Sequence, residues 1–276
     1  MNYLACTFSN PQNEALKVML TELLGNIGFD SFMDVNDGVT AYCVETAFDE
    51  KALDEILSME QLADVQIIKK EIIPDQDWNA TWESSYEPVV IDGICRIRAP
   101  FHDPDSSYRY DICIEPKMSF GTAHHETTAQ IVSLMLNDDF KNKDVLDMGS
   151  GTGVLAILAK KLGAAKTVAI DNDEWAYRNA IDNVKLNDEN EIVVELGDAN
   201  SLNNRYFDII IANINRNILL RDMHEYVKCL KSHGKIFFSG FYESDLQMIK
   251  DESSRLGLTY VSHVKKNDWT AAVFVK

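Results

Sequence analysis

The 276-residue sequence has only five cysteines, and they are scattered without a CxxC pair. An odd number without paired spacing argues against a disulfide framework and a zinc site. The sequence also lacks any apolar run near the ~18 residues of a membrane-spanning helix. Its start has no basic segment followed by an apolar core. We therefore expect a cytoplasmic protein without a membrane anchor. The cysteines are Cys6, Cys43, Cys95, Cys113 and Cys229.

Basic residues are scarce, because 26 Lys and Arg stand against 44 Asp and Glu and leave a net charge of −18. Binding a nucleic-acid backbone needs local clusters of Lys and Arg. None is visible, so we expect no direct contact with nucleic acid. Residues 1–74 hold 13 acidic and 4 basic side chains, which is half of the net charge. This acidity either keeps the surface solvated or offers a docking surface for a basic protein.

The first 74 residues alternate between strand and helix patterns, with a strong Asn36-Asp37-Gly38 turn. The order β-α-β-β-α-β is typical of a small ferredoxin-like domain, which Pro74 closes. Residues 75–88 follow as an expected linker with a short helix, in which Trp78 and Trp82 share one face. The expected strands are 3–8, 31–33, 40–44 and 65–73, and the expected helices are 13–24 and 51–59.

Residues 145–171, VLDMGSGTGVLAILAKKLGAAKTVAID, show the pattern of strand, glycine turn, helix, strand and terminal acid. Gly149 and Gly151 let the backbone turn sharply where a Cβ would block a ligand. The helix should start near Thr152. Asp171 ends the second strand, at the sheet edge where an open parallel sheet binds ligands. Its carboxylate can accept both hydroxyl hydrogens of a ribose there.

The glycine spacing discriminates between two nucleoside cofactors. A dinucleotide fingerprint reads GxGxxG, whereas this turn reads GSGTG. A dinucleotide also needs a helix N-terminus for its pyrophosphate, and S-adenosyl-L-methionine has none. We therefore predict S-adenosyl-L-methionine as the cofactor and regard a dehydrogenase as the weakest alternative.

The last residues predict a strand that runs against the rest of the sheet. Residues 258–264 and 270–275 are rich in β-formers, and the five residues between them are too few for a crossover helix. We predict an α/β fold for residues 89–276, a Rossmann-like class I methyltransferase domain with seven strands and an antiparallel C-terminal strand.

Further polar residues follow predicted strands or precede helices. Thr127 and Thr128 stand at a helix start, where their hydroxyls either cap the helix or reach a ligand. His124 and His125 could be metal ligands, but no other His, Cys or carboxylate falls at ligand spacing nearby, so no metal site is expected. Asp198 follows the third strand and either accepts the adenine amino group or lies in a solvated turn. Asn213 ends the fourth strand.

The residues after Asn213 indicate the kind of acceptor. Methyltransferases that act on planar nitrogens commonly place two prolines there, whereas this chain has Ile214, Asn215 and Arg216. The pattern favours an aliphatic amine. We expect Asn213, Thr127 and His125 to orient it.

The motifs SFGTAHHETT, LDMGSGTG, AIDND and ANINRNILL, in this order behind an acidic domain, resemble the ribosomal protein L11 methyltransferase family over essentially the whole chain. The family loop usually reads FGTG before its histidine, and this chain has Ala123 instead. The resemblance implies S-adenosyl-L-methionine contacts from Thr128, Gly149, Asp171 and Asn213. It also implies an N-terminal domain that grips L11, free or in the ribosome, and methylation of lysines and the α-amino group.

The expected reaction is an in-line displacement in which a neutral amine attacks the sulfonium methyl. An unperturbed lysine has a pKa of about 10.4, so only roughly one in 2,500 is neutral at pH 7. The site must therefore desolvate and position the amine. Two alternatives stay open: another class I N-methyltransferase, acting on a protein or a small amine, and a noncatalytic cofactor-binding module. Nothing demands an oligomer, and we expect a monomer.

Overall fold

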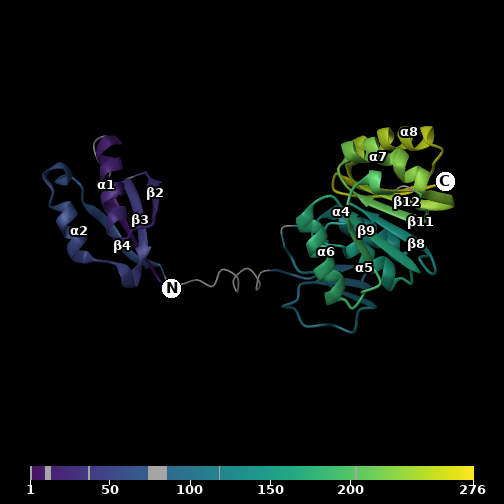
Figure 1. Ribbon diagram of the computed structural model, residues 1–276, viewed down its shortest axis with the longest axis horizontal. Coiled ribbons are helices and arrows are strands. Elements are labelled where there is room, and N and C mark those ends of the chain that lie inside the picture. The colour runs from purple at the N-terminus through teal and green to yellow at the C-terminus, as the bar shows by residue number, and fades with distance from the viewer. Residues whose placement is uncertain (1, 10–13, 37, 74–85, 118, 203) are drawn as a thin grey trace. The chain divides into compact units, whose positions relative to one another are not determined.

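The computed structural model describes residues 2–9, 14–36, 38–73, 86–117, 119–202 and 204–276 (Figure 1). The chain divides into two compact units, residues 1–85 and 86–276. The expected linker helix with Trp78 and Trp82 lies outside the described residues. Residues 86–88, the end of the expected linker, belong to the second unit.

The first unit is a four-stranded antiparallel sheet in the order β2-β3-β1-β4, with two α-helices in the connections. This is the predicted ferredoxin-like arrangement. Alternate residues of β1 point into its core, where Phe8 packs with Leu20 and Leu24 of α1. The elements are β1 (Tyr3–Ser9), α1 (Glu14–Asn26), β2 (Ser31–Val35), β3 (Gly38–Val44), α2 (Glu50–Leu57) and β4 (Ile67–Ile73).

The second unit contains a seven-stranded sheet in the order β10-β9-β8-β11-β12-β14-β13. The first five strands are parallel, and β14 runs antiparallel to both neighbours. The predicted fold class and its reversed C-terminal strand are confirmed. These strands are β8 (Asp144–Met148), β9 (Lys166–Asp171), β10 (Val193–Leu196), β11 (Phe207–Asn213), β12 (Leu230–Tyr242), β13 (Thr259–Lys266) and β14 (Trp269–Val275).

Helices cover both faces of this sheet, so its strands are apolar on both sides. Ile209 and Ile211 of β11 pack into one core with α4, α5 and α6, whereas Ile210 packs into the other with α7 and α8. The helices are α4 (Glu126–Leu136), α5 (Val154–Lys161), α6 (Glu174–Leu186), α7 (Arg216–Cys229) and α8 (Leu246–Arg255). Helix α5 begins two residues later than predicted, because Gly153 still has a turn conformation with φ of +80°.

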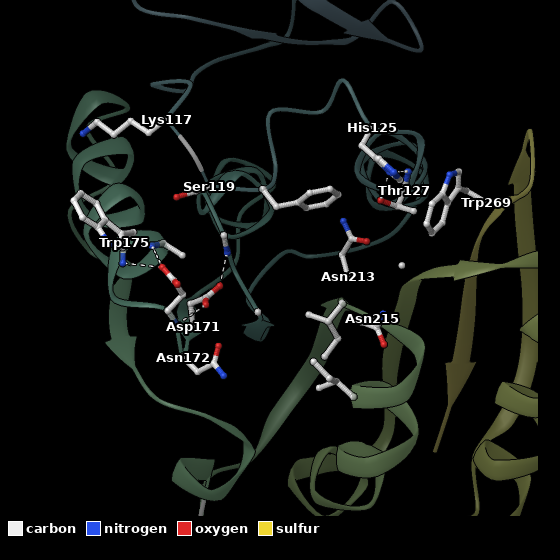
Figure 2. A pocket seen from close by; sticks show the side chains of 18 residues that line it. Lys117, Ser119, His125, Thr127, Asp171, Asn172, Trp175, Asn213, Asn215 and Trp269 are labelled. Carbon is white, nitrogen blue, oxygen red and sulfur yellow. Dashed lines mark hydrogen bonds between the residues drawn. The ribbon is translucent and has the colours of Figure 1, made fainter. Parts of the chain in front are cut away.

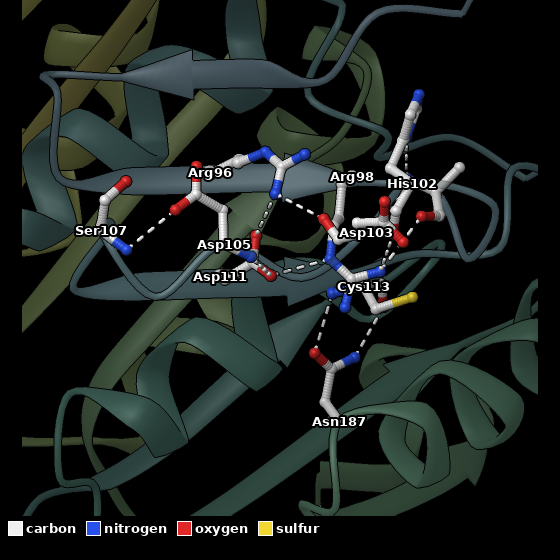
Figure 3. A network of polar contacts seen from close by, with 10 residues as sticks. Arg96, Arg98, His102, Asp103, Asp105, Ser107, Asp111, Cys113 and Asn187 are labelled. Carbon is white, nitrogen blue, oxygen red and sulfur yellow. Dashed lines mark hydrogen bonds and ion pairs between the residues drawn. The ribbon is translucent and has the colours of Figure 1, made fainter. Parts of the chain in front are cut away.

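A separate three-stranded sheet precedes the main sheet in the chain, and a network of polar contacts surrounds it (Figure 3). It comprises β5 (Val89–Ile91), β6 (Cys95–Arg98) and β7 (Tyr110–Cys113). The Asp111 carboxylate accepts from Nε of Arg98 at 2.8 Å and from Nη1 of Arg96 at 3.4 Å. Asn187, the C-cap of α6, accepts from the Cys113 N–H with its Oδ1 and donates from its Nδ2 to the Cys113 backbone oxygen. These contacts anchor the chain that enters the loop before α4.

Candidate functional site

A cavity of about 1100 Å³ lies where the parallel strands end (Figure 2). Strands β8, β9 and β11 are adjacent and parallel, so their carboxyl ends share one edge of the sheet. In Figure 2, Trp175 and Asp171 lie toward one end of the cavity, and His125, Thr127 and Trp269 toward the other. We call the first the Asp171 end and the second the acceptor end. Asn213 faces the space between them.

The Asp171 carboxylate is held rigidly at its end of the cavity. Its Oδ2 accepts from the backbone N–H of Gly151 at 2.8 Å, and its Oδ1 accepts from Asp173 N–H at 3.0 Å. A carboxylate has about four lone-pair sites, so each oxygen keeps one to accept a further hydrogen bond. This geometry suits two neighbouring hydroxyl groups, as a ribose presents.

Gly149 and Gly151 line the cavity, and both have positive φ, +71° and +54°. Other protein atoms occupy the positions where a Cβ of either glycine would lie. A Cβ on Gly149 would collide with Ile214, and one on Gly151 with the Phe120 carbonyl group. Thr152 N–H donates to that same Phe120 oxygen at 2.9 Å. The glycine turn therefore packs against the loop before α4 and also faces the cavity.

Asn213 and Thr128 form a buried pair at the end of β11. Asn213 Nδ2 donates to Thr128 Oγ1 at 3.1 Å, which leaves Asn213 Oδ1 with no hydrogen-bond partner among the described residues. An unsatisfied buried acceptor costs free energy, so it indicates a ligand that donates there. Thr128 is fully buried and does not line the cavity. The structure thus places it behind Asn213.

His125 and Thr127 both line the acceptor end. His125 is the N-cap of α4, and its Nδ1 accepts from Thr127 N–H at 3.3 Å. The same Nδ1 lies 2.9 Å from Thr127 Oγ1, so both the backbone and the hydroxyl group of Thr127 contact this ring nitrogen. The His125 ring centroid lies 5.2 Å from that of Phe120 and 4.7 Å from that of Trp269, which in turn lies 4.2 Å from that of Tyr242. This aromatic wall is the main feature that the sequence did not predict.

Asp198 is not brought to the cavity. Its carboxylate accepts from the backbone N–H of Asn200 at 2.9 Å and from the Asn200 Nδ2 at 3.1 Å, within its own turn. Other lining residues went unnoticed in the sequence, including Trp175, whose side chain is exposed at the rim. Phe120 lay inside the SFGTAHH motif, but Trp175 and Trp269 carried no periodic or motif signal. Further lining residues are Lys117, Ser119, Asn172, Asn215 and Ile218.

Asp147, the acid of LDMGSGTG, is fully buried beneath the glycine turn. Its Oδ2 accepts from Ala156 N–H of α5 at 3.0 Å, and its Oδ1 has no partner among the described residues. Burial raises its pKa to about 7, and the negative charge of Asp171 contributes to the rise. Asp147 therefore stabilises the strand-to-helix turn and does not face the cavity.

Within the described part of the chain, no three His, Cys, Asp or Glu side chains are grouped to hold a metal ion. None of the helices described there is long and apolar enough to cross a membrane.

The strand order with a reversed β14, the glycine turn and the strand-end cavity together define a class I methyltransferase fold. A family model described as ribosomal protein L11 methyltransferase (PrmA) matches residues 23–276. The chain therefore belongs to the ribosomal protein L11 methyltransferase family, as its motifs predicted.

Individual relatives agree with this family. The ribosomal protein L11 methyltransferase of Phocaeicola vulgatus is 46% identical, with 100% of this chain and 99% of the relative covered. The protein of the same name from Bacteroides thetaiotaomicron is 44% identical, with 99% of each covered. A crystal structure of ribosomal protein L11 methylase from Lactobacillus delbrueckii is 26% identical with a TM-score of 0.63, covering 68% of this chain and 98% of that one.

Proposed function

We propose that this protein transfers methyl groups from S-adenosyl-L-methionine to amino groups of ribosomal protein L11, namely lysine side chains and the N-terminal amine. The observation that carries the proposal is the cavity with two chemically different ends. A rigid carboxylate marks one end, and an aromatic wall beside an unsatisfied amide oxygen marks the other. Family membership supports the reaction and the substrate.

The cavity suits this cofactor in size and polarity. Asp171 offers two acceptors for the ribose hydroxyls, and Gly149 and Gly151 leave backbone at the cavity wall. Pockets for one small molecule are roughly 300–1000 Å³. A cavity of about 1100 Å³ therefore has room for the cofactor and an entering side chain. When bound, the cofactor supplies an electrophilic methyl group.

The residues of the acceptor end can hold an aliphatic amine. Asn213 Oδ1 is available to accept from the amine N–H, which turns the nitrogen lone pair toward the other end of the cavity. The rings of Phe120, His125 and Trp269 match the apolar stem of a lysine and can contact a methylated ammonium by cation–π attraction. Phe120, His125, Thr127, Asn213 and Trp269 line the cavity there without a carboxylate.

The surroundings at the acceptor end affect the pKa of the substrate ammonium, which must lose a proton before the amine can attack. Burial among apolar rings penalises the ammonium form and lowers its pKa, which raises the neutral fraction. His125 Nδ1 is engaged by the backbone and hydroxyl of Thr127 at the start of α4, so we assign His125 the role of orienting the acceptor. We infer that water accepts the proton at the open side of the cavity.

The N-terminal unit is proposed to dock the substrate. The 13 acidic and 4 basic residues of positions 1–74 complement a basic ribosomal protein and accelerate its encounter with the enzyme. Because the proposed substrate is a ribosomal protein, the proposal places the reaction in the cytoplasm.

The test is transfer of labelled methyl from S-adenosyl-L-methionine to purified large-subunit ribosomal proteins. The full chain is compared with residues 86–276, the second compact unit. Label in L11 that is lost on truncation supports both the chemistry and the docking role. Label in another protein or a small amine would point to a different N-methyltransferase, and cofactor binding without any transfer to a noncatalytic module. Mass spectrometry of labelled L11 identifies the modified amines.

A further inference from the structure

The turn between β13 and β14 is fastened to helix α4 by two side-chain hydrogen bonds. Gln130 Nε2 donates to the backbone oxygen of Trp269 at 2.9 Å. Asn267 Nδ2 donates to Glu126 Oε1 at 2.8 Å. Glu126 and Gln130 are four residues apart, so they lie on the same side of α4. One helix side therefore holds the hairpin that carries Trp269.

Of the two hydrogen bonds, the one from Gln130 involves the more deeply buried side chain. Its side chain is 5% exposed, and its amide oxygen has no partner among the described residues. Burying a carboxamide with an unsatisfied oxygen costs free energy, which an apolar residue of similar size would avoid. The bond to Trp269 is the only hydrogen bond of this side chain among the described contacts, and it spans 139 positions of sequence. The residue is therefore better explained by the placement of Trp269 than by packing alone.

Helix α4 also holds the opposite side of the acceptor end. Its Thr128 accepts the hydrogen bond from Asn213, and His125 at its N-cap lies against the Trp269 ring. The first two turns of α4 therefore contact both groups proposed to hold the substrate: Asn213, whose amide oxygen would bind the amine, and Trp269, whose indole would contact the lysine stem. These two residues come from different strands of the sheet, Asn213 from β11 and Trp269 from β14.

We propose that Gln130 is a positioning residue for methyl transfer, which acts by holding Trp269 at the acceptor end of the cavity. The proposal rests on the proposed function for its effect on catalysis. Glu126 assists through Asn267 at the more exposed end of the same contact.

The first experiment replaces Gln130 by methionine in the full chain, because methionine keeps the volume and removes the donor. We expect kcat/KM for methyl transfer to L11 to fall about tenfold, the effect of one lost hydrogen bond of about 1.4 kcal/mol. The Kd for S-adenosyl-L-methionine, measured by calorimetry, should stay within twofold. The matched control is Gln247→Met in α8, whose exposed amide donates to Asp251 on the same helix. A parallel rise in Kd would contradict a role confined to the acceptor end.

A double-mutant cycle separates positioning from general stability. In the Trp269→Ala background, Gln130→Met should change kcat/KM by less than twofold, because the side chain that Gln130 positions is gone. A tenfold effect that persists there would overturn the proposal. If Gln130→Met folds poorly, Glu126→Ala removes the exposed bond alone and should lower kcat/KM about threefold, while Glu126→Gln keeps the acceptor and should restore it.

Amide hydrogen exchange gives a readout that does not depend on activity. Exchange at residues 266–269 should be at least tenfold faster in Gln130→Met than in wild type or Gln247→Met. Unchanged exchange would refute the hold on the hairpin. If the wild-type protein methylates no L11 but the exchange difference is present, the proposed function fails and the structural hold of Gln130 on Trp269 stands.

Discussion

Replacing Gly151 by alanine tests whether the glycine turn supports the loop before α4. Gly151 has φ of +54°, and a Cβ there would lie far inside van der Waals contact with the Phe120 carbonyl oxygen and 3.1 Å from its carbon. The left-handed backbone costs an alanine about 1–2 kcal/mol. Forcing the Phe120 backbone aside adds about 1–3 kcal/mol, as in other overpacked sites. We therefore expect the free energy of unfolding to fall by about 2–5 kcal/mol.

The matched control is Gly257→Ala, between α8 and β13. Gly257 also has positive φ, +87°, but a Cβ there meets no heavy atom within 4 Å. It should cost only the backbone strain, about 1–2 kcal/mol. Both variants are measured by urea unfolding, with the slope against denaturant checked for constancy. Equal losses in the two variants would refute the argument that Phe120 packs across the glycine turn.

The same substitution should weaken the proposed binding of S-adenosyl-L-methionine at the Asp171 end. Gly151 N–H donates to Asp171 Oδ2 and its neighbour Thr152 donates to Phe120, so displacing this backbone disturbs both contacts. We expect the Kd for S-adenosyl-L-methionine to rise at least tenfold in Gly151→Ala, which corresponds to about 1.4 kcal/mol. In Gly257→Ala it should not change. Calorimetric titration of the two variants measures this difference.

Four further outcomes are expected. Asp171→Ala should raise the Kd for the cofactor about 10- to 100-fold by removing two charged acceptors, and calorimetry would contradict this if Kd moved less than threefold. Asn213→Ala should lower kcat on L11 at least tenfold, whereas a kcat within twofold of wild type in the labelling assay would remove its proposed role. The Asp147 carboxyl has a pKa of about 7 in the folded protein against 3.8 normally, so the native state keeps a proton that the unfolded chain loses. The free energy of unfolding should therefore fall by about 3 kcal/mol as the pH rises from 4 to 7. Urea unfolding of Asp147→Asn over this range should lack that contribution, and parallel curves for the two proteins would refute it. Ala123 has φ of +65° and is buried, so Ala123→Gly relieves strain but loses a packed methyl group, and the free energy of unfolding should change by less than about 1 kcal/mol.

The Asp171 end of the cavity could be predicted from local sequence. The residues from Val145 to Asp171 form one continuous strand-turn-helix-strand unit, and Asp171 follows directly from the end of β9. The turn conformation at Gly149 and Gly151 depends on their own lack of a Cβ. Asp198 shows the limit of this reasoning, because a strand-end acid is equally able to bond its own turn, as it does with Asn200.

The acceptor half depends on contacts between distant segments. Trp269 meets His125 across 144 positions of sequence, Gln130 bonds Trp269 across 139, and Thr128 bonds Asn213 across 85. No local pattern distinguishes a threonine that faces a ligand from one that braces an asparagine, since both cap or follow the same helix start.

The sequence alone determined that a ferredoxin-like unit precedes a class I methyltransferase fold, in which order the strands follow along the chain, and that the last strand is reversed. It also determined that Asp171 ends a strand. These features could be predicted because hydrophobic periodicity and turn chemistry are local properties of the sequence. Only the tertiary structure decided that Phe120 closes over the glycine turn and that Trp269 joins His125 at the acceptor end. The physical reason is that side chains from separate elements acquire a common geometry only when the sheet and its helices pack together.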